Sequence, residues 1–187
     1  MLGFSIATTV LVGKYIGEGD KKSAERSAYS GAACSAGYMI IMGVLFVLFT
    51  HWFISLFKGE GITDAMFIDI SYYARWLLVM LAVLGLFDAI NVTFSGALKG
   101  AGDTWFTMWI SVVMSWLVFA PSVYIVTDVL KTNIFWAWLC FIIYVALLAA
   151  SYWGRFIAGK WKNIEIREKP APPIVSETVA EAQIIEN

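Results

Sequence analysis

Residues 76–104 read WLLVMLAVLGLFDAINVTFSGALKGAGDT, in which an apolar run to Ser95 contains one acidic residue and is followed by closely spaced glycines. The part from Trp76 to Ser95 is long enough to cross a bilayer, which takes about 20 helical residues. Asp88 lies inside this run, where inserting a charged side chain costs about 2.5–3.5 kcal/mol. A carboxyl group at such a depth therefore needs a reason, either in function or in packing.

The rest of the chain repeats this pattern of long apolar runs between short polar connectors. Of its 187 residues 60% are hydrophobic and the mean hydropathy is +0.75, whereas soluble domains are nearer half apolar. Because lipid offers no partner for free backbone groups, we predict an all-α fold, a polytopic membrane helix bundle. Its five apolar segments cover about 1–16, 28–57, 67–98, 105–129 and 134–157.

The two ends of the chain differ from its middle. At 1.5 Å per residue, the first segment reaches only about 24 Å of the roughly 30 Å core. We expect it to be a truncated helix whose first half is missing. Residues 1–162 are predicted to form the membrane domain. Residues 163–187 are polar and rich in proline, which predicts a disordered cytoplasmic tail.

Lysine and arginine positions predict the orientation of the bundle. Ten of the 13 lysines and arginines lie in the connectors after the first and third segments and in the region after the fifth. Cytoplasmic loops carry such an excess. We therefore predict a multi-pass protein of the cytoplasmic (inner) membrane with a cytoplasmic C-terminus.

Asp88 is the candidate site for ion coupling. A carboxylate that exchanges a proton or holds Na⁺ can couple an ion gradient to movement, whereas a structural carboxyl would only bond a neighbouring helix. Asn91 and Ser95 follow at i+3 and i+7, on the same side of a helix. They are candidates to line a wet cleft, although interhelical hydrogen bonding would also explain them.

Five further residues are candidates for the cleft or for helix movement. Ser111 and Ser115 lie four apart and could face the same cleft as Asp88. Gly96 and Gly100 have the GxxxG spacing, which suits either close helix packing or a hinge. Pro121 removes a backbone donor and is predicted to kink its helix.

Several function classes are disfavoured. A net charge of −1 does not suggest a nucleic-acid partner. With one histidine and one deep acid, the chain lacks the converging groups of an active site, so we predict that it is not an enzyme and needs no cofactor. Five tryptophans near segment ends suit an interfacial belt, namely Trp52, Trp76, Trp105, Trp153 and Trp161.

Two stretches, GFSIATTVLVGKYIGEGDKKSAER (3–26) and LFDAINVTFSGALKGAGDT (86–104), together resemble the multidrug and toxic-compound extrusion (MATE) transporters. The first stretch has the family's valine–glycine pair, glycine–acid loop and basic helix start. The second stretch is similar to its acidic helix and GALRGxGDT-type connector, and Pro121 with Tyr124 matches the following helix. The resemblance implies a twelve-helix fold of two six-helix lobes, of which this chain would be the C-terminal lobe from within its second helix onward.

The same resemblance implies a function. The chain would be a fragment of a Na⁺- or H⁺-coupled antiporter that exports amphipathic organic cations or drugs, with Asp88 as the coupling carboxylate. Its partners would be membrane lipid, a small organic substrate and the missing N-terminal lobe. Two alternatives stay open: a flippase for lipid-linked sugars with related architecture, and a non-transporting membrane assembly subunit.

Overall fold

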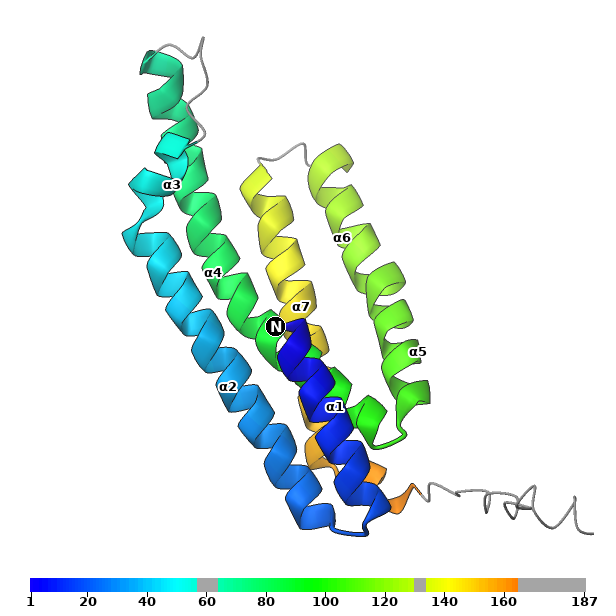
Figure 1. Ribbon diagram of the computed structural model, residues 1–187. Coiled ribbons are helices and arrows are strands. Elements are labelled where there is room, and N and C mark those ends of the chain that lie inside the picture. The colour runs from blue at the N-terminus through cyan, green and yellow to red at the C-terminus, as the bar shows by residue number, and fades with distance from the viewer. Residues whose placement is uncertain (57–63, 130–133, 165–187) are drawn as a thin grey trace, which may run out of the picture.

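The computed structural model describes residues 1–56, 64–129 and 134–164, and every regular element in these ranges is a helix (Figure 1). The elements are α1 (Leu2–Gly17), α2 (Lys21–Leu48), α3 (Thr50–Leu56), α4 (Asp64–Gly100), α5 (Thr104–Met114), the π-helix η1 (Ser115–Phe119), α6 (Ala120–Tyr124), the π-helix η2 (Ile125–Val129), α7 (Ile134–Ile157) and the 3₁₀-helix η3 (Lys160–Asn163).

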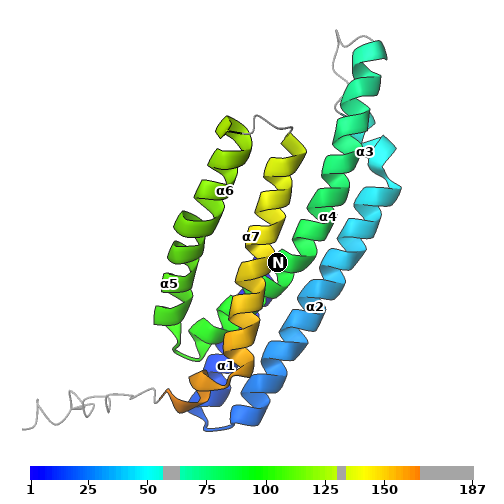
Figure 2. The ribbon, with the colours of Figure 1, turned by 180° about the vertical axis from the view of Figure 1, so that it is seen from behind.

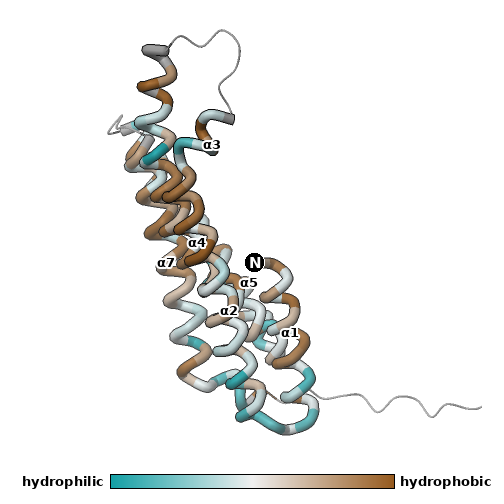
Figure 3. Tube along the Cα trace, turned by 60° about the vertical axis from the view of Figure 1, so that its left-hand side comes forward, coloured by the Kyte–Doolittle hydropathy of each residue, from teal (hydrophilic) through white to brown (hydrophobic). Residues whose placement is uncertain are grey.

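Four stretches of helix are long and apolar enough to cross a membrane, and α1 is a shorter apolar helix of 16 residues. Figure 3 shows hydrophobic residues along the middle of the bundle and hydrophilic ones around the α1–α2 turn. The prediction of an all-α, polytopic membrane bundle is thereby confirmed. The four stretches are Lys21–Leu48, Ile70–Gly100, Thr104–Asp128 and Phe135–Ile157.

The second apolar segment differs from its prediction at both ends. Helix α2 begins at Lys21 because Asp20 caps it: its carboxylate accepts from the Ser23 backbone nitrogen at 3.1 Å. The Ser23 donors hold the pKa of the exposed Asp20 carboxyl below its usual value.

The second apolar segment does not form one continuous helix, since α2 ends at Leu48 and α3 follows. The Thr50 hydroxyl donates to two carbonyl groups of the last turn of α2.

Helix α4 is central to the bundle and packs against α1, α2 and α7. Seen from both sides, α7 lies between α4 and the α5–α6 segment (Figures 1 and 2). Small residues at the contacts, such as Ala89 and Ala97 of α4 and Ala28 of α2, are fully buried. Such residues let helix backbones approach closely in a membrane.

The GxxxG pair lies where α4 crosses α1. A Cβ at Gly100 would lie 2.3 Å from the Thr9 carbonyl oxygen, and one at Gly96 would lie 2.5 Å from the Ser5 Oγ. The Ser5 hydroxyl donates to the Val92 carbonyl at 2.8 Å, and the Thr9 hydroxyl donates to the Gly96 carbonyl at 3.0 Å. Both glycines therefore lie in a close packing contact, while a hinge role stays a prediction.

We expect Gly100→Ala to lower the free energy of unfolding by about 1–3 kcal/mol, because the new methyl group would force apart two backbones. Gly37→Ala is the matched control, since a Cβ there meets nothing within 4 Å and alanine favours the helix by about 1 kcal/mol. Denaturant unfolding in detergent micelles measures both. Equal stability of the two variants would contradict the close contact.

Pro121 lies between two π-helical turns, η1 before it and η2 after it. Proline has no N–H, and its ring clashes with the carbonyl four residues earlier, here that of Leu117. A wider π turn relieves that clash, and such turns are one cause of bends in helices. The hinge role proposed for Pro121 stays a prediction.

The charged connectors lie at one end of the helix bundle. The α1–α2 turn, the α4–α5 turn and η3 lie together at the lower end of Figure 1, opposite α3 and η2. Two ion pairs tie this end together: Lys162 of η3 to Glu25 of α2 at 2.6 Å, and Arg155 of α7 to Asp103 at 2.8 Å. The connectors used to predict orientation therefore share one end of the bundle.

Candidate functional site

Asp88 lies near the middle of the apolar stretch Ile70–Gly100 of α4 and is partly buried. Its Oδ1 accepts a hydrogen bond from the Asn91 Nδ2 at 3.2 Å, at the long end of the range for such bonds. This i, i+3 contact stays within the helix, so it does not attach the carboxylate to another helix. Asp88 and Asn91 thus form a local polar pair near the middle of this apolar stretch.

The carboxylate of Asp88 has no cationic partner among the described residues. The ion pairs among the described residues involve other acids, namely Glu18, Glu25 and Asp103. No group of three or more His, Cys, Asp and Glu side chains comes together in the described ranges either. Any ion held here would therefore depend on a single carboxylate and on neutral oxygen atoms nearby.

The remaining cleft candidates gather around α7. The Ser111 hydroxyl lies 2.6 Å from the Tyr152 hydroxyl, and the Ser115 hydroxyl lies 2.8 Å from that of Tyr144. Ser95 also lies beside the Tyr152 hydroxyl. These contacts match the hydrogen bonds by which polar side chains join membrane helices. A role in lining a cleft stays a prediction for Ser95, Ser111 and Ser115.

The structure therefore divides the predicted polar face into two groups. Asp88 and Asn91 bond to each other, while Ser95 meets Ser111 through Tyr152. The side of α4 one turn beyond Asp88 is covered by α1, where Ser5 bonds the Val92 carbonyl. Asp88 thus lies next to the end of the α1 contact.

The partners on α7 were not predicted from the sequence. Tyr144 and Tyr152 are eight residues apart, about two helical turns, and so share a face. Tyr152 is 3% exposed, and its hydroxyl also donates to the Thr107 carbonyl at 3.2 Å. The spacing of these two tyrosines within an apolar segment was the sequence signal that could have indicated a polar contact on this face.

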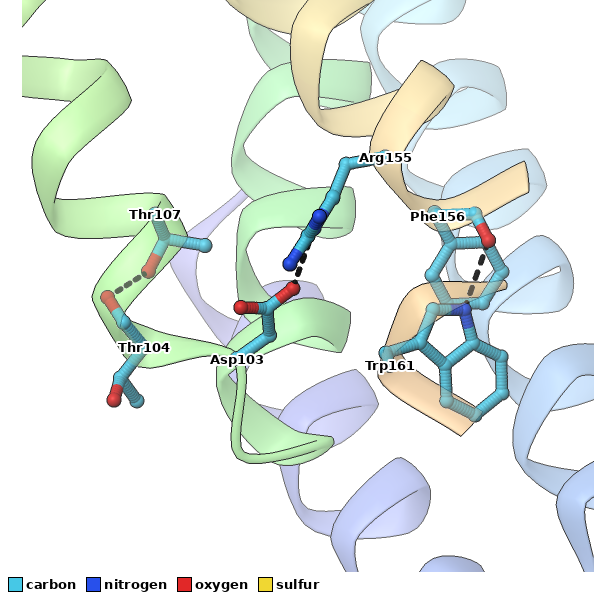
Figure 4. Close-up of polar contacts among 6 residues, drawn as sticks. All are labelled: Asp103, Thr104, Thr107, Arg155, Phe156 and Trp161. Atoms are coloured by element: carbon cyan, nitrogen blue, oxygen red, sulfur yellow. Dashed lines mark hydrogen bonds and ion pairs between the residues drawn. The ribbon is translucent and has the colours of Figure 1, made fainter. Parts of the chain in front are cut away.

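The pair of Asp103 and Arg155 was also missed, because both residues were assigned to connectors and segment ends. Asp103 is 5% exposed, and one of its oxygens accepts from the Arg155 Nε at 2.8 Å (Figure 4). The Arg155 guanidinium also lies over the Phe106 ring, 4.6 Å from its centroid. The pair joins the α4–α5 turn to the last turn of α7.

Trp161 does not belong to an interfacial belt, contrary to the prediction. It is 1% exposed and stacks on Phe156 with ring centroids 4.9 Å apart, and its Nε1 donates to the Phe156 carbonyl at 2.8 Å (Figure 4). The indole ring of Trp161 in η3 is thus part of the protein core. The predicted tail lies outside the described residues from 165 onward. The other four tryptophans of the belt are exposed.

Comparison with known proteins gives two kinds of match. The MatE family model matches residues 1–125, a range that contains Asp88 and every cleft candidate. "Probable multidrug resistance protein NorM" of Pseudomonas syringae pv. tomato is 27% identical over 173 residues, which are 91% of this chain and 36% of that protein.

Two further relatives match most of this chain as well. The protein of the same name from Thermotoga maritima is 28% identical over 164 residues, or 86% of this chain and 33% of that protein. "Multidrug and toxin extrusion protein 2" of Oryctolagus cuniculus is 27% identical over 161 residues, or 86% of this chain and 26% of that protein. The chain thus spans about a third of the length of the bacterial relatives that it matches.

Proposed function

The chain belongs to the MatE family, and on this premise we propose that it forms part of an antiporter that exports amphipathic organic cations or drugs. Na⁺ or H⁺ moving the other way would drive the export. The names of the relatives, which refer to multidrug resistance and toxin extrusion, support this substrate class. A transporter, and not an enzyme, also suits a chain made of apolar helices.

The state of Asp88 is the observation that carries the coupling proposal. A charged side chain at this depth costs about 2.5–3.5 kcal/mol, which an ion pair could offset. Within the described residues Asp88 has no such pair, and its hydrogen bond from Asn91 is long. A mobile cation that binds and leaves would provide the missing partner during part of the transport cycle.

Either coupling ion suits this pair of residues. A proton on Asp88 would remove the charge and allow the carboxyl to donate a hydrogen bond. Na⁺ would instead take oxygen atoms, for which Asp88 offers its carboxylate. Asn91 would add its amide oxygen once its side-chain amide turns, because its Nδ2 faces Asp88 in the structure. Asp88 is partly buried, so part of its side chain is exposed.

We place the end that holds the α1–α2 turn in the cytoplasm, because most of the lysines and arginines lie there. The C-terminus would then be cytoplasmic as well. Alternating access needs two bundles that move against each other around a midplane site. The second lobe would be the partner of this one, with the substrate bound between them.

The proposal is tested by dye export from vesicles that contain the whole transporter. A Na⁺ gradient and a pH gradient are imposed separately, and the loss of an ethidium-type dye is followed by fluorescence. One of the gradients is expected to drive export, and dissipating that gradient with an ionophore is expected to stop it. Export at the same rate with neither gradient would contradict coupling, and no export of any organic cation would contradict the substrate class.

A further inference from the structure

A groove between α1 and α2 is lined by a positively charged side chain that has no role in the proposed transport function. It has a volume of about 450 Å³ and begins near the α1–α2 turn, where Tyr15, Ser23 and Arg26 line it. From there it runs along α1 to Leu11 and Phe4. The groove therefore has a polar, cationic end and an apolar end.

Arg26 is the only charged residue among those that line the groove, and its side chain is exposed. The three carboxylates near it in the sequence already have partners. Glu18 lies 3.8 Å from Lys14, Glu25 lies 2.6 Å from Lys162, and Asp20 caps α2 through Ser23. Within the described residues the guanidinium of Arg26 is thus left without an anion.

Neutral donors accompany this charge. Ser27 and Ser30 also line the groove, and neither hydroxyl is hydrogen-bonded to another described residue. Hydroxyl and guanidinium donors together suit the oxygens of a phosphate group. An organic cation, by contrast, would be repelled by Arg26. The charge thus separates this groove from a site for the proposed export substrate.

The length of the groove matches one leaflet of a bilayer. Eleven residues separate Phe4 from Tyr15 along α1, which corresponds to about 16 Å. The hydrocarbon core is about 30 Å thick, so this is roughly half of it. The polar end lies next to the connector, at the level where headgroups lie, and the apolar end reaches into the bundle.

We infer that this groove binds an anionic phospholipid, with the headgroup phosphate on Arg26 and an acyl chain along Leu11 and Phe4. Basic pockets between membrane helices bind anionic lipid headgroups in this way. Lys14, Lys21 and Lys22 lie in the same part of the sequence and would raise the local concentration of anionic lipid.

Cys34 allows a direct test, because it is exposed and lines the apolar half of the groove. The full chain is placed in phosphatidylcholine nanodiscs with or without phosphatidylglycerol and treated with an uncharged maleimide. Mass spectrometry then compares modification of Cys34 with that of Cys140 in α7, the internal reference. We expect phosphatidylglycerol to slow the reaction of Cys34 about fivefold, the factor that one basic residue near an anionic lipid contributes, and to leave Cys140 unchanged.

Two variants separate the groove from general surface charge. Arg26→Gln is expected to remove the protection, whereas Lys99→Gln, which changes an exposed cation outside the groove, should keep it. Added glycerol phosphate should not protect Cys34, because it has no acyl chain. The inference is overturned if phosphatidylcholine protects equally, if Arg26→Gln keeps the effect, if glycerol phosphate protects as well, or if Cys34 is unreactive in every lipid.

Discussion

Asp88→Asn is expected to reduce gradient-driven dye export by the whole transporter to the background of vesicles that lack it. Asparagine keeps the shape and the hydrogen bond from Asn91 but can neither carry the charge nor exchange a proton. Insertion into the membrane should not suffer, since the substitution removes the cost of about 2.5–3.5 kcal/mol for a buried charge. Export rates at equal protein amounts measure the effect.

Asp128→Asn is the matched control for this experiment. It makes the same chemical change at an exposed acid of η2, whose carboxylate accepts from the Thr127 hydroxyl at 3.0 Å. Wild-type export is expected for it. If Asp88→Asn exported dye at the wild-type rate under the driving gradient, the carboxyl would be structural and the coupling role would be lost.

Arg155→Ala is expected to lower the free energy of unfolding by about 3 kcal/mol, because it leaves the Asp103 carboxylate buried without a partner. We take the lower end of the usual 3–5 kcal/mol because the Arg155 side chain is 23% exposed, against 6% for Asp103. The loss of packing on Phe106 acts in the same direction. Denaturant unfolding in detergent micelles gives the free energy.

The second ion pair at the same end provides the comparison. Lys162 and Glu25 are 36% and 40% exposed, so water already screens their attraction. Lys162→Ala should therefore cost less than about 1 kcal/mol. A double variant, Asp103→Asn with Arg155→Ala, is expected to recover part of the loss, since no charge then stays buried. Equal losses for Arg155→Ala and Lys162→Ala would show that burial of Asp103 does not matter.

Helix type and approximate position followed from hydropathy alone, because a bilayer accepts few structures and demands a minimum length. The prediction for the last membrane segment, 134–157, matches α7 (Ile134–Ile157). The break at Phe49 before α3 was not foreseen, because both sides of it are apolar. Side-chain bonds from Thr50 back to the preceding turn accompany this break.

The candidate site was only partly accessible from the sequence. The proximity of Asp88 and Asn91 follows from helical spacing, since residues three apart meet on one face. The bonds of Ser111 to Tyr152 and of Ser115 to Tyr144 join residues 41 and 29 positions apart, so no local pattern encodes them. The orientation of two helices about their axes decides which hydroxyls meet.

Periodicity, charge counts and segment length were thus sufficient to predict a bundle of membrane helices with one deep acid. Each of these properties depends only on a single helix and on the solvent around it. Whether a charged or aromatic group is buried depends on other helices. Arg155 and Trp161 look like surface residues in the sequence, yet Arg155 pairs with the buried Asp103, 52 positions away, and Trp161 is buried against the ring of Phe156. Burial arises from packing between segments, and packing exists only once the chain has folded.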